Sequence, residues 1–258
     1  MDLTITPTKL HGAVTPPPSK SQAHRLLIAA ALSGGVSTIH NLADSQDIAA
    51  TRRCLAALGA RIDELGENTV QVHGLGNAVV EAGPAPILDC GESGSTLRFL
   101  IPLALLVNGE AAFTGHGRLM ERPLKPYEDL FREKGIAWKW ENGRLTVDGG
   151  RGYGDYVLDP GEYRLPGNVS SQFFTGLLFV LPLLDGDSTL VPTTPLESRD
   201  YLELTRQVQA LAGVRSRWQG EALFIPGGQR YRPFEAAVEA DWSQAAFWYA
   251  ANFLGGEV

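Results

Sequence analysis

The sequence predicts an α+β domain built from three repeats, each made of a strand, a helix, a second strand, a second helix and a hairpin. Three segments, 21–35, 95–109 and 171–186, begin with small polar residues, continue as an apolar helix and end in glycine. Their starts lie 74 and 76 residues apart. Because self-similarity at a nearly fixed period is typical of repeat architectures, we expect the three units to share one local fold.

Each apolar helix is followed by the same further elements. A short strand comes first, and then an amphipathic helix that ends before a glycine, the residue most often found just past a helix end. The last is a hairpin, clearest in the middle unit, where Asn142 and Gly143 separate alternating hydrophobic residues. The strands are expected at 38–42, 111–115 and 188–192, the glycines are Gly59, Gly135 and Gly213, and the hairpins span 61–72, 138–147 and 214–225.

The pattern restarts after the third hairpin. Residues 237–241 read as a strand, and Ser243 leads into an apolar helix that runs to Leu254, so a fourth unit opens there. A strand at Leu3 to Ile5 has no evident mate in the first unit. We expect both ends of the chain to belong to a second domain.

Length and composition fit a globular protein. The 258 residues suffice for one large or two modest domains, since single cores rarely grow beyond about 250 residues. With 44% hydrophobic and 20% charged residues, the composition excludes a disordered chain and a coiled coil. The net charge of -7 argues against a nucleic-acid partner, because phosphate neutralisation needs a basic face. Any anion must therefore be bound by a local site.

Cysteine content and the apolar runs indicate a cytoplasmic protein without a membrane partner. Cys54 and Cys90 are too few for a disulfide framework or a metal cluster, which favours a reducing compartment. The two most apolar runs contain Pro102 and Pro182 and fall short of the roughly 20 residues that cross a bilayer. We expect these runs to be core helices.

The starts of the three apolar helices are candidate anion sites, because a helix N-terminus presents unbonded N–H groups and a partial positive charge. Hydroxyl, amide or cationic side chains stand at these starts, in residues 18–25, 91–98 and 166–172. Ordinary capping by serine and asparagine explains one such segment equally well. It does not explain Lys20, because a cation beside a positive helix end is unfavourable unless an anion lies between them.

Familiar catalytic motifs are missing from the sequence. Residues 91–95 depart from the nucleophile elbow at the fifth position, and neither a Walker A string nor GxGxxG occurs. The five histidines have no short pairing at metal-ligand spacing. Arg118 and Arg122 lie in a loop punctuated by glycine and proline, either as a solvated charge run or as functional residues. Arg122 has the chemistry to bind a carboxylate or phosphate with two prongs.

Several strings together resemble the 5-enolpyruvylshikimate-3-phosphate synthase family. They occur in family order, and the resemblance spans essentially the whole chain but only about the first three-fifths of the usual family length. The strings are Ser19-Lys20-Ser21 with Arg25, Ser93-Gly94-Ser95-Thr96-Leu97-Arg98, Glu121-Arg122-Pro123, Val169-Ser170-Ser171-Gln172-Phe173, and Ser198 with Tyr201.

The resemblance implies an inside-out α/β fold of two domains, each with three repeats, helices inside, sheets outside and helix N-termini facing the cleft between the domains. It also implies domain boundaries. Residues 1–13 would contribute a strand to the second domain, residues 14–235 would form the shikimate-3-phosphate-binding domain, and residues 236–258 would be the crossover and the start of a truncated second domain.

A reaction and a set of binding residues follow from the resemblance. The family transfers the enolpyruvyl (carboxyvinyl) group of phosphoenolpyruvate to the 5-hydroxyl of shikimate 3-phosphate, a step of aromatic amino acid biosynthesis, and is the target of glyphosate. No metal or organic cofactor is implied. Ser21, Arg25, Gln172 and Tyr201 would hold the shikimate ring and carboxylate, and Ser170, Ser171 and Ser198 the 3-phosphate. Lys20, Gly94, Arg122 and Gln172 would face phosphoenolpyruvate, with Lys20 stabilising the departing phosphate.

The chain departs from the family pattern in three respects. Pro18 and Phe99 stand where many members have glycine and proline, so the loop geometry there is expected to differ. The family's aspartate general base and further arginines belong to the second domain and map onto no residue here, since Glu239 and Asp241 match only the crossover. We therefore expect the chain alone to be inactive or nearly so.

Three other functions remain open. The first is UDP-N-acetylglucosamine enolpyruvyl transferase, which shares the architecture, although its entry motif has Lys-Asn in place of Lys20-Ser21 and its loop cysteine has no match here. The second is a non-catalytic phosphometabolite-binding module, which the unmatched second half favours. The third is a purely structural fragment.

The last helix points to a further partner. It carries Phe247, Trp248, Phe253 and Leu254 among small apolar residues and is too apolar to lie bare in water. We expect it to dock on the domain, to pair with a second copy of the chain, or to fray.

Overall fold

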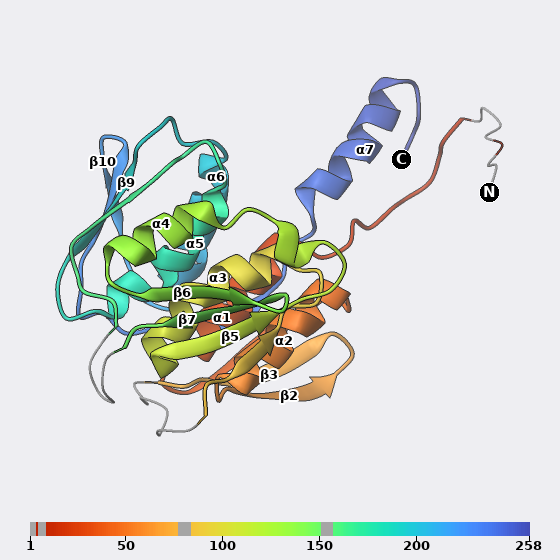
Figure 1. Cartoon of the computed structure of the whole chain (residues 1–258). Helices are drawn as coiled ribbons and strands as arrows, with labels where there is room; N and C mark the ends of the chain where they lie inside the picture. Colours follow the sequence, from red (N-terminus) through yellow and green to blue (C-terminus); the bar gives the residue numbers. More distant parts are fainter. Residues whose placement is uncertain (1–3, 5–8, 77–83, 151–156) are drawn as a thin grey trace.

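Among the residues described by the computed structural model of the chain, three four-stranded sheets surround a group of helices (Figure 1). The structure describes residues 4, 9–76, 84–150 and 157–258. The first unit contains α1 (Lys20–Ala31), β1 (Val36–His40), α2 (Gln46–Ala57), β2 (Arg61–Gly66) and β3 (Thr69–His73). The second contains β4 (Ile87–Asp89), α3 (Gly94–Asn108), β5 (Glu110–Thr114), the short helix η1 (Leu119–Glu121), α4 (Lys125–Glu133), β6 (Ala137–Glu141) and β7 (Arg144–Asp148). The third contains β8 (Glu162–Leu165), α5 (Ser171–Val180), η2 (Leu181–Leu183), β9 (Ser188–Pro192), α6 (Arg199–Leu211), β10 (Arg217–Gln219) and β11 (Ala222–Ile225), and β12 (Glu235–Ala237) follows it.

The glycine and asparagine residues that mark the ends of the predicted elements adopt the expected backbone conformations. The glycine after each second helix is left-handed, with φ of 106° at Gly59, 78° at Gly135 and 81° at Gly213. Between β6 and β7, Asn142 and Gly143 both have positive φ, 52° and 72°, as a two-residue type I′ turn requires. These turns end each element locally, so the predicted boundaries agree closely with the structure.

The three sheets share one strand order. In each sheet a first strand runs parallel to the second, and the second pairs antiparallel with the hairpin that follows it. The orders are β12-β1-β3-β2, β4-β5-β7-β6 and β8-β9-β11-β10. The predicted threefold repeat is therefore confirmed at the level of sheet topology.

The first sheet takes its leading strand from the other end of the domain. β12 runs parallel to β1, with Thr38 opposite Glu235 and His40 opposite Ala237. The expected strand at 237–241, assigned to a fourth unit, is thus wrong in position and in sheet. The physical reason is that β1 would otherwise expose unpaired backbone groups along one edge, and β12 covers that edge.

The helices α1, α3 and α5 form the core between the sheets. In α1 the residues from Ala23 to Ala31 are buried, and in α5 those from Phe173 to Val180. Gly176 lets α5 approach α3 closely, since a Cβ at this position would lie 2.6 Å from the backbone oxygen of Arg98. The expected architecture of helices inside and sheets outside is confirmed (Figure 1).

The two apolar runs interrupted by proline are core helices, as predicted. Pro102 is buried within α3, and Pro182 is buried in η2, directly after α5. Within the described ranges, no helix combines the length and the apolarity that a membrane crossing requires.

The last helix, α7 (Trp242–Phe253), projects away from the domain, beside the N-terminal segment (Figure 1). Two backbone bridges join these segments, between Pro18 and Ala240 and between His11 and Glu257. The first bridge lies directly before α1, so the crossover is attached next to the start of an inner helix.

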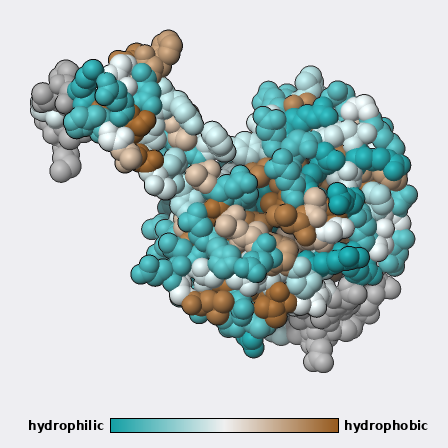
Figure 2. All heavy atoms as spheres, turned by 180° about the vertical axis from the view of Figure 1, so that it is seen from behind, coloured by the Kyte–Doolittle hydropathy of each residue, from teal (hydrophilic) through white to brown (hydrophobic). Residues whose placement is uncertain are grey.

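Several large apolar side chains of α7, and that of Leu254 directly after it, are exposed. Phe247 is 71% exposed, Phe253 91% and Leu254 84%, and Figure 2 shows hydrophobic atoms on the projecting arm. Docking on the domain, one of the three expected outcomes for this helix, is therefore not what the structure shows. Pairing with a second copy and fraying stay predictions. The strand expected at Leu3 to Ile5 lies outside the described residues, apart from Thr4.

Candidate functional site

Each of the three inner helices begins with a serine cap. The hydroxyl oxygens of Ser19, Ser93 and Ser170 accept hydrogen bonds from backbone N–H groups in the first turns of α1, α3 and α5, at 3.4, 3.2 and 3.2 Å. Ordinary capping therefore accounts for these three residues. Ser170 also lines a pocket, and other polar residues at the helix starts line the same pocket or bind one another.

A pocket of about 300 Å³ lies where α1, α3, α5 and α6 come together at their N-terminal ends. Seven of the ten residues expected to bind substrate line it: Ser21, Arg25, Ser170, Ser171, Gln172, Ser198 and Tyr201. Ser95, Phe99, Val169 and Glu197 complete the wall and were not expected there. The other three expected residues, Lys20, Gly94 and Arg122, lie outside this wall.

Arg25 is the buried cation of the pocket, with only 2% of its surface exposed. Its Nε donates to the Thr205 hydroxyl at 2.8 Å, its Nη1 to the Ser21 carbonyl at 2.7 Å and its Nη2 to the Tyr201 carbonyl at 3.1 Å. Burial lowers the pKa of Arg25 to about 10, so the guanidinium stays charged at neutral pH. Across the described part of the chain, no carboxylate is paired with it, which leaves a positive charge available to an anion.

Two aromatic rings flank the Arg25 guanidinium. Its Cζ atom lies 5.2 Å from the ring centre of Phe99 and 5.7 Å from that of Tyr201. Such contacts stabilise the charge and restrict its position. Tyr201 is 42% exposed, so its ring belongs to the part of the pocket wall that is open to solvent.

Ser198, which precedes α6, has a left-handed backbone with φ of 57° and ψ of 42°. This region is uncommon for residues other than glycine, asparagine and aspartate, and such conformations cluster at functional sites. Because Ser198 lies on the pocket wall, this backbone conformation determines the position of its hydroxyl group relative to the pocket.

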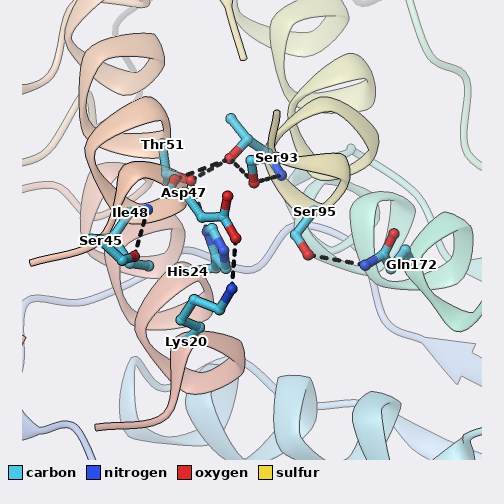
Figure 3. A network of polar contacts seen from close by, with 10 residues as sticks. Lys20, His24, Ser45, Asp47, Ile48, Thr51, Ser93, Ser95 and Gln172 are labelled. Atoms are coloured by element: carbon cyan, nitrogen blue, oxygen red, sulfur yellow. Dashed lines mark hydrogen bonds and ion pairs between the residues drawn. The ribbon is translucent and has the colours of Figure 1, made fainter. Parts of the chain in front are cut away.

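The Gln172 amide is held from both ends. Its Nε2 donates to the Ser95 hydroxyl at 2.9 Å (Figure 3), and its Oε1 accepts from Nη1 of Arg98 at 2.8 Å. Arg98 was missed as a site residue, although a signal was present. It follows Ser95 by three positions, as Arg25 follows Ser21 by four, so in both helices a cation lies one turn after a pocket serine.

Gly94 allows two guanidinium groups to converge beside the start of α3. A Cβ at Gly94 would lie 2.7 Å from Nη1 of Arg122 and 2.9 Å from Nη1 of Arg98. Burial, and then the nearby charge of Arg122, lower the pKa of Arg98. Two cations this close repel each other, which favours an anion between or beside them. Arg98 and Arg122 thus form a second positive patch beside Gly94, joined to the pocket by the hydrogen bond between Arg98 and Gln172.

Lys20 already has an anionic partner. Its Nζ lies 2.7 Å from Oδ2 of Asp47, in the first turn of α2 (Figure 3), and the Lys20 side chain is 55% exposed. The anion that we expected beside Lys20 is therefore the carboxylate of Asp47, a residue of the protein itself. To bind a ligand, the Lys20 ammonium group must break its ion pair with Asp47 or contact Asp47 and the ligand together.

A series of hydrogen-bond contacts between buried side chains, the His24 ring and three hydroxyl groups, connects α1, α2 and α3 (Figure 3). His24 Nδ1 contacts the Thr51 hydroxyl at 2.7 Å, which contacts the Thr96 hydroxyl at 2.7 Å, which donates to Ser93 at 2.7 Å. Burial lowers the pKa of His24 to about 4, so the ring is neutral at physiological pH. These contacts therefore hold the starts of the helices in place relative to one another without adding a charge.

The arrangement suits a small ligand with more than one anionic group. The pocket offers one buried guanidinium and several hydroxyl groups at helix N-termini, which bind carboxylate and phosphate oxygens. Beside Gly94 there are two further guanidinium groups, those of Arg98, which is hydrogen-bonded to Gln172, and Arg122. Glu197, an exposed acid on the pocket wall, is the one lining residue of opposite charge.

Comparison with known proteins identifies close relatives along the whole chain. The family model described as EPSP synthase (3-phosphoshikimate 1-carboxyvinyltransferase) matches residues 5–258. A 3-phosphoshikimate 1-carboxyvinyltransferase of Clostridium kluyveri is 46% identical over 256 residues, which cover 98% of this chain and 58% of that protein. One from Clostridium perfringens is 42% identical over 257 residues, with the same two coverages. The chain thus spans 58% of the length of these curated relatives.

Solved structures agree in fold. An EPSP synthase of Acinetobacter baumannii superposes with a TM-score of 0.76, covering 93% of this chain and 52% of that one. The sequences are 24% identical, so this likeness speaks for the fold alone. Because the family model matches the chain nearly end to end, the chain belongs to the EPSP synthase (3-phosphoshikimate 1-carboxyvinyltransferase) family.

Proposed function

We propose that this chain supplies the shikimate 3-phosphate side of an enolpyruvyl transferase. In the proposed reaction the 5-hydroxyl of shikimate 3-phosphate adds to C2 of phosphoenolpyruvate and the methylene carbon gains a proton. The resulting tetrahedral intermediate then expels phosphate. The observation that carries the proposal is the buried Arg25 guanidinium, which lacks a carboxylate partner among the described residues and stands in a pocket of hydroxyl groups.

Arg25 is assigned to the carboxylate of shikimate 3-phosphate. A guanidinium binds a carboxylate through charge-assisted hydrogen bonds, and desolvation makes these bonds stronger than they are in water. Ser21, Gln172 and Tyr201 line the same pocket and are assigned to the ring and its hydroxyl groups. Since these groups are held by helix starts and hydrogen bonds before a ligand arrives, the ring would be oriented without rearrangement of the fold.

The 3-phosphate is assigned to Ser170, Ser171 and Ser198. Ser170 and Ser171 stand at the N-terminus of α5, where backbone N–H groups and the helix dipole favour a phosphate. Ser198 lies at the start of α6 on the same wall. Two helix N-termini would therefore face one dianionic group.

Phosphoenolpyruvate is assigned to Gly94 and Arg122, at the positive patch beside the pocket, together with Lys20 and Gln172. Arg122 is free of a ring stack or salt bridge in the described part of the chain, and the bare backbone at Gly94 leaves its guanidinium room. Lys20 would exchange its contact with Asp47 for the departing phosphate, whose developing charge an ammonium group stabilises. No metal or organic cofactor enters this proposal.

The first test is turnover of the 258-residue chain with both substrates, followed as phosphate release. We expect little or none, because the general base that the family resemblance implies maps onto no residue of this sequence. Ordinary turnover would overturn this part of the proposal and leave the assignment of substrates standing.

The second test is calorimetric titration with shikimate 3-phosphate, with and without phosphoenolpyruvate. The proposal predicts one-to-one binding of shikimate 3-phosphate alone and little synergy with phosphoenolpyruvate. Synergistic binding would show that the chain completes the second subsite by itself. A chain that binds phosphorylated metabolites regardless of the carboxylate fits a general phosphometabolite-binding module, and a chain that binds none fits a structural role.

Two further assignments belong to this proposal. The exposed apolar side chains of α7 support self-association through that helix, and we expect analytical ultracentrifugation to give a concentration-dependent dimer that Phe247→Ser weakens. A monomer at all concentrations would contradict this.

The two free, buried cysteines support a cytoplasmic location.

A further inference from the structure

The Arg25 guanidinium, on α1, is held by two other helices, α5 and α6, through neutral groups only. Its Nε donates to Oγ1 of Thr205 on α6 at 2.8 Å, and its Nη2 approaches Oγ1 of Thr175 on α5 at 3.4 Å. Both threonines are completely buried. The two hydroxyl oxygens lie 3.4 Å apart, so together they form a cradle under one edge of the guanidinium.

The direction of the Thr205 hydroxyl is settled by its other bond. A hydroxyl group has one proton to donate, and that of Thr205 goes to the Tyr201 carbonyl at 2.9 Å. The lone pairs of Thr205 therefore face Nε of Arg25, and the contact is a hydrogen bond of defined polarity. Valine has the same shape but offers no lone pair, so it cannot replace this function.

The cradle determines which edge of the guanidinium meets the pocket. A guanidinium has five N–H bonds. Nε is bonded to Thr205, and Nη2 is bonded to Tyr201 and Thr175. Nη1 makes one contact, to the Ser21 carbonyl, so among the described residues one of its N–H bonds has no protein acceptor. Ser21 and Arg25 both line the pocket, so this free donor belongs to a residue of the pocket wall.

Neutral oxygens also leave the charge of Arg25 uncompensated. An acidic residue at the cradle would hold the guanidinium more strongly but would cancel its charge, and a buried pair of this kind attracts a second anion poorly. Threonine orients the group without cancelling it.

We propose that Thr205 is a positioning residue for carboxylate recognition: by fixing Nε of Arg25 with a neutral acceptor, it presents Nη1 to the carboxylate of the ligand. Thr175 supports the same orientation through its weaker contact. This inference rests on the proposed function, since it specifies which group of shikimate 3-phosphate the cradle serves.

The test titrates the full chain with two ligands, shikimate 3-phosphate and its analogue that lacks the carboxylate. We expect Thr205→Val to weaken shikimate 3-phosphate binding by about 10-fold, the worth of a hydrogen bond to a charged group, and to leave the affinity for the analogue within about twofold. Thr205→Ser keeps the hydroxyl and should restore most of the loss. Thr205→Asp should abolish the preference for the carboxylate.

Thr146→Val on β7 is the matched control, because it makes the same chemical change outside the pocket, and neither affinity should move. Equal losses for both ligands with Thr205→Val would show a merely structural role and overturn the inference, as would an unchanged affinity for shikimate 3-phosphate. If Thr205→Val does not fold, Thr175→Val and Thr205→Ser decide by the same two-ligand comparison. An unaltered chain that binds neither ligand, or that binds both equally, refutes the proposed function itself. An unaltered chain that prefers shikimate 3-phosphate, with a preference that Thr205→Val leaves unchanged, refutes only the inference.

Discussion

Two cations on one helix illustrate two ways of preparing a binding site. Arg25 is buried, held by neutral oxygens from α1, α5 and α6, and has no acidic partner in the described part of the chain. Lys20, five residues earlier on α1, is more than half exposed and bonded to Asp47. Arg25 is ready for an anion before one arrives, whereas Lys20 must first give up or share an anion. The two residues should therefore differ in how much ligand binding depends on each.

The largest effect is expected from Arg25→Met, which keeps the volume of the side chain and removes its charge. Loss of one partner of a buried, hydrogen-bonded charge pair costs about 3 to 4 kcal/mol, so shikimate 3-phosphate should bind roughly 100- to 1000-fold more weakly. Calorimetry measures the change. Arg118→Met is the control, since this guanidinium is 89% exposed, pairs with Glu121 and lies outside the pocket. If Arg25→Met weakened shikimate 3-phosphate binding by less than about fivefold, the proposed difference between Arg25 and Lys20 would be wrong.

The next effect concerns His24, a basic group between the two cations that burial keeps neutral. Below its ordinary pKa of 6.5, the unfolded chain takes up a proton at His24, while the folded chain does so only near pH 4. The free energy of unfolding should therefore fall as the pH drops from 6.5 to 4, by about 3 kcal/mol from this group alone.

Urea unfolding at several pH values checks this prediction. His24→Gln should show a shallower loss of stability over the same window, and His11→Gln, at an exposed position, should behave like the unaltered chain. Parallel pH curves for His24→Gln and the unaltered chain would mean that His24 is protonated in the folded state.

A smaller effect is expected from Lys20→Met. Because the ammonium group is exposed and already paired, its loss should weaken shikimate 3-phosphate binding by about fivefold or less. The same titration as for Arg25 measures it. A loss as large as that of Arg25→Met would show that exposure and pairing do not distinguish the two cations.

The smallest effect has the opposite sign. Asp47→Asn removes the partner of Lys20 and should raise the affinity for shikimate 3-phosphate by about threefold at low salt, with the gain fading as salt screens the charges. Asp129→Asn is matched in charge and in geometry, since Lys125 and Asp129 also lie 2.7 Å apart, but that pair is on α4, which contributes no residue to the pocket, whereas Lys20 directly precedes the lining residue Ser21. Equal gains in both variants would point to net charge instead of Lys20.

Local signals allowed much of the fold to be predicted from the sequence. The Asn142-Gly143 turn and the glycines that end the second helices act over a few residues, so they could be read without knowledge of the tertiary structure. The place of β12 could not, because its partner β1 lies almost 200 residues away and no local pattern specifies that pairing. Hydrogen bonds between distant strands depend on the closed arrangement of all three units.

The same distinction applies to the site. Five of the expected residues that line the pocket stand at helix starts where hydroxyl groups, amides and cations recur in the repeats: Ser21, Arg25, Ser170, Ser171 and Gln172. Ser198 and Tyr201 were expected only from the family resemblance. The pairing of Lys20 with Asp47 was not predicted, since the two residues are 27 positions apart and belong to different helices. The buried state of Arg25 also escaped prediction, because the threonines that hold it come from α5 and α6. The packing of the helices therefore determines which of the two cations is free to bind an anion, and no local sequence pattern reports it.

The most direct test is a crystal structure of the chain with shikimate 3-phosphate. We predict one molecule in the pocket, with its carboxylate at hydrogen-bond distance, about 3 Å, from the Arg25 guanidinium and its phosphate against Ser170, Ser171 and Ser198. A phosphate on Arg25, or a ligand bound beside Lys20 with the pocket left empty, would contradict the account.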